Sequence, residues 1–428
     1  MAQAGVDVHV ALGEDGTIRV ASGPVVGRAE DGSDAAAVAP GFTGAVLDVA
    51  GAVLVWPVLG EPGLPVAEVN DVGRAQQWLW AVYGERTAAA VHACAAGEPA
   101  GVRVTADMTA LAGGAARLGF GHWASRWWPA SYADGIPALE PDVLGLELAA
   151  LTHRCQQLFD DFGDQPDDCV AELIEEHQAA LDLLIQWWRA APQQADTARH
   201  LESVLRLIDD AADSAGLDGS ALRRLRSSLD QDRPAGTPVG PGALFARHDG
   251  YALAAGELLL AGGRVIARGS GTNDWRRYPP GFVDASEHAV SWTARALGAR
   301  RRIEIEVVAH VAAPADGAPL VAEVRVNGGH PDRVFLARRD DMWTGRADLD
   351  LHLPDGAIPP RFEVGVLLPG FDPGPGPEGR GDRDAIRALV RRRLATAAQP
   401  LAYDASPHDA SSGLFLAEIA AAATGEDY

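Results

Sequence analysis

The chain has 428 residues, a formal net charge of −23 and 47% hydrophobic residues. This hydrophobic content is typical of a globular protein rather than a disordered one, and the length suits two or three domains that each bury a core. The acidic charge argues against binding to nucleic-acid phosphates, which needs a basic surface, and against binding to an anionic membrane surface.

All thirty-six basic residues are arginine, and the chain contains no lysine. The absence excludes Schiff-base chemistry, a P-loop lysine and acetylation or ubiquitin-like modification of an ε-amine. Two explanations stay open. The abundance of Ala, Gly, Arg, Asp and Val suggests a GC-rich genome whose codons favour arginine, and the alternative is selection against amine tagging.

Residues 1–140 are predicted to form a mixed α/β N-terminal domain. Alternating apolar residues from Val6 to Val10, followed by a Gly-Glu-Asp-Gly turn, indicate a β-hairpin. The other predicted elements are a hairpin over 44–49 and 52–56, a helix over about 72–95 capped by Asn70 or Asp71, a short strand at 102–104, and a glycine-weakened helix from about Asp107 to Trp128.

Residues 141–230 are predicted to form an antiparallel helical array. Apolar residues recur there every three to four positions in four successive stripes, and each stripe needs a neighbour to cover it. Short connections favour antiparallel neighbours. Residues 231–243 are rich in proline and glycine, which predicts a linker and marks the clearest boundary in the chain.

Residues 244–370 change from helical to strand periodicity. Apolar and charged residues alternate in five segments, beginning at about 290, 303, 324, 343 and 362. One apolar and one charged face per strand predict an antiparallel, β-sandwich-like domain or a partly open barrel. Residues 371–428 are predicted to hold a Pro/Gly connector, an arginine-rich helix over 382–394 and a short tail helix over 411–423. The predicted fold class is therefore α+β.

The three cysteines, Cys94, Cys155 and Cys169, are odd in number and widely spaced, so no disulfide framework is expected. A reducing cytosol is the expected location. Residues 1–20 lack the basic start of a signal peptide, and no apolar run approaches the roughly 20 residues that cross a bilayer. We therefore expect a cytoplasmic, bacterial protein that binds neither membranes nor nucleic acid.

Two residue sets are candidate metal sites. Asp160, Asp161 and Asp164 match the clustered carboxylates that hold Mg²⁺ in isoprenoid-diphosphate enzymes. A second motif on another helix is missing, so a solvated acidic loop between two helices is the favoured interpretation. His153, Cys155, Cys169 and His177 supply two imidazoles and two thiols for Zn²⁺. Their spacing departs from compact zinc patterns, and Cys155 and His177 fall on apolar helix stripes. No cofactor is expected.

Two aromatic clusters are candidate protein interfaces, because tryptophan, tyrosine and arginine anchor such contacts. The alternative is that each cluster packs inside the fold. The residues of the first are Trp123, Arg126, Trp127, Trp128 and Tyr132, and those of the second, in a predicted loop, are Trp275, Arg276, Arg277 and Tyr278.

Two functional classes follow. The first is a non-enzymatic adaptor or assembly protein that makes protein–protein contacts in a multi-component system; arginine is enriched in interface cores whereas lysine is depleted. The second is a metal-assisted enzyme that uses the acidic Asp160–Asp168 segment or the Cys/His set. No residue set meets the geometric requirements of an active site, so we expect an adaptor with a protein partner, although a β-region edge that binds carbohydrate or peptide is a further possibility.

Overall fold

The computed structural model describes the chain as two compact units. Unit 1 comprises residues 1–126, 139–246 and 392–428, and unit 2 comprises 127–138 and 247–391. The residues that the structure describes are 6–22, 41–60, 63–97, 102–106, 109–159, 166–190, 195–231, 241–245, 264–298, 300–310, 313, 319–349, 360–371, 379–399 and 413–424.

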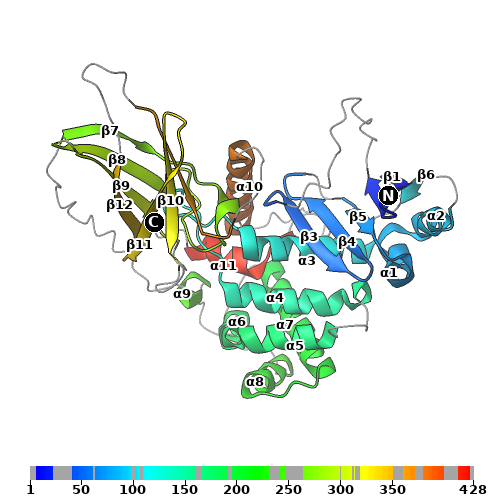
Figure 1. Cartoon of the computed structure of the whole chain (residues 1–428). Helices are drawn as coiled ribbons and strands as arrows, with labels where there is room; N and C mark the ends of the chain where they lie inside the picture. Colours follow the sequence, from blue (N-terminus) through cyan, green and yellow to red (C-terminus); the bar gives the residue numbers. More distant parts are fainter. Residues whose placement is uncertain are drawn as a thin grey trace. The chain divides into compact units, whose positions relative to one another are not determined.

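Unit 1 contains a six-stranded antiparallel sheet in the order β3-β4-β5-β2-β1-β6 (Figure 1). Both predicted hairpins are confirmed, as β1 pairs with β2 and β3 with β4. The strands are β1 (Val6–Leu12), β2 (Ile18–Ser22), β3 (Gly44–Val49), β4 (Ala52–Pro57), β5 (Val66–Val69) and β6 (Val102–Ala106). The alternation in β1 and β2 predicts a half-buried strand, and Val8, Val10 and Val20 are fully buried as expected.

Helices cover the apolar face of this sheet. The predicted helix over 72–95 is two helices, α1 (Val72–Tyr83) and α2 (Glu85–Ala95), because Gly84 adopts φ +83° and breaks the helix. Asp71 caps α1 by accepting a hydrogen bond from Arg74 N, as predicted. In α3 (Ala110–Trp127), a Cβ at Gly119 would lie 3.1 Å from Trp56 Cζ3, so this glycine permits close helix–sheet packing.

Helices account for most of the described residues in the region predicted as helical from 141 to 230. Its helices are α4 (Pro141–Arg154), α5 (Pro166–His177), α6 (Leu181–Arg189), α7 (Ala195–Ser214) and α8 (Ser220–Leu229), followed by the short α9 (Pro241–Phe245). They belong to the same compact unit as the N-terminal sheet and α11 (Leu416–Thr424). A separate helical array is therefore not confirmed, because the buried faces of these helices complete a shared core.

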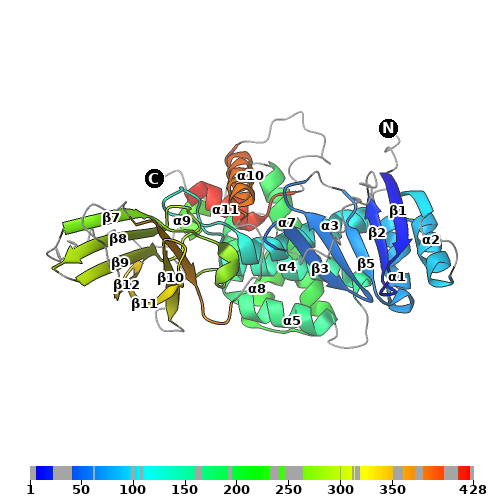
Figure 2. The ribbon, with the colours of Figure 1, turned by 45° about the horizontal axis from the view of Figure 1, so that its top comes forward.

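Unit 2 contains a seven-stranded antiparallel sheet in the order β13-β10-β11-β12-β9-β8-β7 (Figure 2). Its strands are β7 (Arg264–Ser270), β8 (Val290–Leu297), β9 (Arg300–Val308), β10 (Leu320–Val326), β11 (Asp332–Arg339), β12 (Met342–Leu349) and β13 (Phe362–Leu367). The first five residues of β11 pair with β10 and its last three pair with β12, so the strands of unit 2 form one curled sheet. The predicted sandwich is not confirmed.

The predicted charged face of this sheet is present. Arg302 on β9 and Asp348 on β12 are direct cross-strand partners, and Arg302 Nε lies 2.8 Å from Asp348 Oδ1. Arg295 on β8 pairs with Glu304 on β9 at 3.2 Å. Opposite charges across neighbouring strands stabilise the pairing and neutralise one another.

Helix α10 (Arg380–Ala398) confirms the predicted arginine-rich helix but buries part of its charge. Arg383 and Arg387 are 0% and 4% exposed and both pair with Glu287. Across the described ranges, no helix combines the length and the apolar character needed to cross a bilayer. The described residues therefore form a mixed α+β fold with two antiparallel sheets.

Candidate functional site

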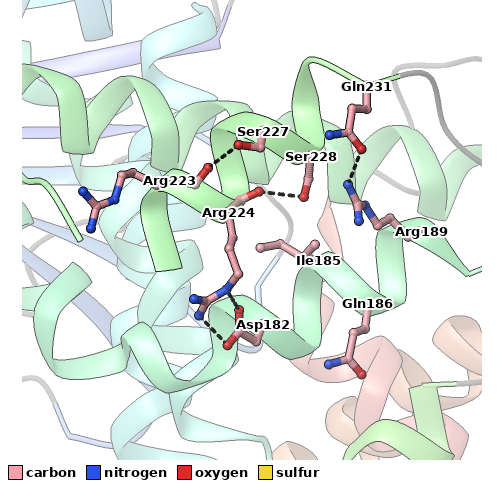
Figure 3. Close-up of a pocket in the computed structure, with 9 residues that line it drawn as sticks. All are labelled: Asp182, Ile185, Gln186, Arg189, Arg223, Arg224, Ser227, Ser228 and Gln231. Atoms are coloured by element: carbon pink, nitrogen blue, oxygen red, sulfur yellow. Dashed lines mark hydrogen bonds and ion pairs between the residues drawn. The ribbon is translucent and has the colours of Figure 1, made fainter. Parts of the chain in front are cut away.

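A cavity of about 590 Å³ lies between α6 and α8 in unit 1 (Figure 3). On α6, the side chains that face the cavity follow helical spacing, with Asp182, Gln186 and Arg189 at positions i, i+4 and i+7. The opposite side of α6 buries Leu184, Trp187 and other apolar residues. This amphipathic pattern fixes the rotation of α6 and therefore directs its polar stripe toward α8.

Helix α8 and the residues that follow it form the other wall. Arg224 holds the two helices together, because Nε and Nη2 donate to Asp182 Oδ1 and Oδ2 at 2.9 and 2.7 Å. The hydrogen bond with Asp182 raises the pKa of Arg224, so this guanidinium stays charged. The remaining lining residues are Ile185, Arg223, Ser227, Ser228 and Gln231.

Arg189 lies at the end of α6 with part of its hydrogen-bonding capacity unused. Its Nη2 donates to Gln231 Oε1 at 3.1 Å. Its Nε is buried and has no hydrogen-bond partner among the described residues. A buried donor without a partner costs about 1–3 kcal/mol, so an acceptor supplied by a ligand would stabilise this position.

The cavity carries an excess of positive charge. Three arginines and one aspartate line it, and Arg223 is 67% exposed and 3.8 Å from Asp218. Arginine is suited to bidentate contacts with carboxylates. The hydroxyls of Ser227 and Ser228 donate to helix carbonyls, so they are satisfied by the fold. The arrangement is suited to binding an anionic group.

The unit that carries this cavity is strongly acidic. Unit 1 contains thirty-eight carboxylate side chains and seventeen arginines, a formal charge of −21 with histidine neutral. Unit 2 contains twenty-one carboxylates and nineteen arginines, a formal charge of −2. The lining of the cavity, with three arginines and one aspartate, thus differs in charge balance from the unit as a whole.

The first aromatic cluster is divided between the two units. In unit 1, Trp123 is buried, its Nε1 donates to Phe42 O at 2.7 Å, and Arg126 is exposed. In unit 2, Trp127 and Trp128 are half-buried, and Tyr132 is 42% exposed. Trp123 is thus a packing residue, and the interface role of the exposed members stays a prediction.

The second aromatic cluster is held inside unit 2. Trp275 and Tyr278 are buried, Arg276 pairs with Asp274 at 2.8 Å, and Arg277 pairs with Glu323 at 2.7 Å. The hydroxyl of Tyr278 donates to Asn273 Oδ1, and burial raises the pKa of this tyrosine well above its usual value. The packing alternative accounts for these positions, whereas an interface role stays a prediction.

Buried polar side chains next to this cluster are also satisfied within unit 2. Asp284 accepts hydrogen bonds from Ser131 Oγ, Tyr132 N and Ser286 N, all within 2.8 Å. Burial raises the pKa of Asp284, and the three donors oppose that effect. The side-chain amide of Asn273 donates to two backbone carbonyls. These groups link loops of unit 2 to one another.

The candidate zinc ligands have other contacts. His177 Nδ1 lies 3.0 Å from Asp142 Oδ1, and His153 Nδ1 lies 3.1 Å from Gln156 Nε2. Cys155 is buried, and burial raises its pKa to about 11, whereas Cys169 is exposed. No three His, Cys, Asp or Glu side chains form a metal-binding group in the part of the chain that the structure describes. Asp160, Asp161 and Asp164 lie outside the described residues.

The α6–α8 cavity was not predicted from the sequence. Its only signals were the helical spacing of Asp182, Gln186 and Arg189 and the density of arginine in α8, both of which also fit a solvated helix face. Comparison of the chain with protein-family models, with curated proteins and with solved structures finds no match.

Proposed function

We propose that this chain is a non-enzymatic adaptor or assembly protein that binds an acidic segment of a partner protein in the α6–α8 cavity. The proposal rests chiefly on the excess of arginine over aspartate in a cavity on a unit of charge −21. Such an adaptor works in a bacterial cytosol, in keeping with a chain of three cysteines and no disulfide among them.

Charge geometry explains why the partner segment is acidic. The carboxylates of unit 1 repel an anionic ligand, but salt screens this repulsion beyond about 8 Å under physiological conditions. Only a segment that places carboxylates within hydrogen-bond distance of Arg189 and Arg223 gains enough to stay bound. Complementary charge of this kind supplies specificity more than raw affinity.

The experiment is a binding titration with the full-length chain. The probe is a fluorescent twelve-residue peptide that alternates Glu with small residues, and its reference has every Glu replaced by Gln. We expect saturable binding of the Glu peptide alone. In the double variant Arg189→Ala/Arg223→Ala, the Kd rises by about a hundredfold or more, since two charge-assisted contacts are lost and each is worth about 1.5–3 kcal/mol.

The matched control is Arg206→Ala. Arg206 lies on α7, is 57% exposed, pairs with Glu202 and does not line the cavity. Binding in this variant should equal that of the unmodified chain. Equal affinity for the Glu and Gln peptides, or an equal loss of affinity in the control and the double variant, rules out the proposed site.

A further inference from the structure

Residues 414–418 and 420–422 are buried in unit 1, although they lie far along the chain from α3 and α4, which they contact. Helix α11 packs against α4 and α9 (Figure 1). Phe415, Leu416, Ala417 and Glu418 are each 0% exposed. Thirteen residues outside the described ranges separate the segment 413–424 from Gln399, just beyond the end of α10.

Side chains from distant helices bind the backbone at the start of this segment. Glu147 Oε2 on α4 accepts from Leu416 N at 2.6 Å. Arg117 Nη2 on α3 donates to Leu414 O at 2.9 Å, and Arg393 Nη2 on α10 donates to Gly413 O at 2.7 Å. Side chains of three other helices therefore bind the start of α11 through its backbone groups, as a protein binds a peptide ligand.

Two buried carboxylates organise these contacts. Glu147 Oε1 accepts from Arg117 Nη2 at 3.2 Å and is 3.1 Å from His200 Nε2. Glu418, the third residue of α11, accepts from Phe415 N at 2.8 Å, which satisfies a backbone donor at the helix start. Arg393 donates from Nε and Nη2 to Glu418 Oε1 and Oε2 at 2.6 and 2.7 Å.

An aromatic stack fills the centre of the site. The rings of Phe120 on α3 and Phe415 are parallel within 6°, with centroids 6.2 Å apart. Arg393 Cζ lies 4.4 Å above Phe120, and Arg117 Cζ lies 5.2 Å above Phe415. A Cβ at Gly121 would lie 3.0 Å from Phe415 Cζ, so this glycine makes room for the ring. Unit 1 thus contacts the side chains of Phe415 and Glu418 as well as the backbone of the segment.

We propose that this site is a helix-binding groove whose occupant is exchangeable, and that two copies of the chain associate by docking each 413–424 segment in the other's groove. A helix of nine residues is not stable alone in water, so the groove supplies its structure. The same segment from a second copy makes every contact described above. Exchange of an identical element is a low-cost route to a dimer, and the second docking event in such a pair is intramolecular.

The decisive experiment mixes two samples of the full-length chain that carry donor and acceptor fluorophores on the exposed Cys169. Incubation at high protein concentration and about 0.5 M salt screens the repulsion between chains of charge −23. We expect dimers in light scattering, energy transfer between the labels, and slow loss of that transfer after dilution. A chain that stays monomeric at every concentration, with no energy transfer, overturns the proposal.

A second measurement tests the groove itself. A labelled peptide of residues 413–424 should bind the Phe415→Ala chain at least about tenfold more tightly than the unmodified chain, since the intramolecular competitor is present at an effective concentration near millimolar. A peptide carrying Phe415→Ala is the reference and should bind neither. If the Phe415→Ala chain does not fold, as judged by circular dichroism, the mixing experiment alone decides.

Discussion

Glu147 on α4 and Leu416 at the start of α11 are 269 residues apart in the chain, and a 2.6 Å hydrogen bond joins them. The carboxylate is 1% exposed and also holds Arg117 and His200. One side chain therefore connects α3, α4, α7 and the C-terminal segment.

Glu147→Ala should be among the most destabilising substitutions in the chain. Removing one partner of a buried ion pair costs about 3–5 kcal/mol, because the remaining charge is left in a low-dielectric site. The measurement is the free energy of unfolding in urea. The reference is Glu202→Ala, whose exposed i,i+4 pair with Arg206 is worth about 0.3–0.5 kcal/mol. Similar losses in the two variants would contradict this account of the buried network.

Two glycine-to-alanine substitutions should change the stability of the protein in opposite directions. At Gly145 on α4, a Cβ would lie 1.9 Å from His177 Cδ2, so Gly145→Ala must displace that ring or the helix. At Gly113 on α3, nothing lies within 4 Å of the added Cβ. We expect Gly145→Ala to destabilise by about 1–3 kcal/mol and Gly113→Ala to stabilise by about 0.5–1 kcal/mol. Thermal unfolding of both variants measures the difference.

Thiol reactivity should distinguish the three cysteines. Cys94 and Cys155 are buried, and burial raises the pKa of Cys155 to about 11, so its thiolate is scarce at neutral pH. Cys169 is exposed. In the native protein at pH 8, a thiol-specific reagent should modify one cysteine per chain, and Cys169→Ser should abolish that reaction. Rapid modification of the Cys169→Ser chain would show that the helices around Cys155 open.

His122 should make stability depend on pH. Burial lowers its pKa from the ordinary value of 6.5, so the folded state holds fewer protons than the unfolded state in this range. The contribution of His122 to folding stability is complete above pH 6.5 and is lost as the pH falls toward the pKa of this histidine in the folded state. The difference in unfolding free energy between pH 7.5 and 5.5 should therefore shrink in His122→Gln. The exposed His92→Gln is the reference, and an unchanged difference in His122→Gln would refute the prediction.

Arg383→Lys tests whether arginine could be replaced by lysine in this chain. Arg383 is 0% exposed, and its Nε and Nη2 donate to the two oxygens of Glu287 at 2.6 and 3.0 Å. An ammonium cannot form this planar, two-bonded contact, so a loss of about 1–3 kcal/mol is expected. Arg206→Lys at the exposed site should change stability by less than about 0.5 kcal/mol. If both substitutions have equal, negligible effects on stability, codon usage is a sufficient explanation for arginine in place of lysine at buried sites too.

Local patterns in the sequence predicted many elements of this fold. Alternation identified the hairpin of β1 with β2 and the strands β8, β9, β10, β12 and β13, and helical spacing identified the stripes of 141–230, because a strand or helix with one buried face must repeat with its own period. Strand β11 was not predicted. The Asp71 cap was also predictable, since capping depends on neighbouring residues.

Periodicity does not encode which element packs against each face of a helix or strand. Only the tertiary structure decided that. Alternation in β10, β11 and β12 is the same in a sandwich and in one curled sheet, and only the division of β11 between two neighbours distinguishes them. The stripe of Asp182, Gln186 and Arg189 became a cavity wall only because α8 lies opposite. Glu147 and Glu418 resemble ordinary helix-surface acids in the sequence, yet both are buried, because arginines from other helices supply the charge that makes their burial possible.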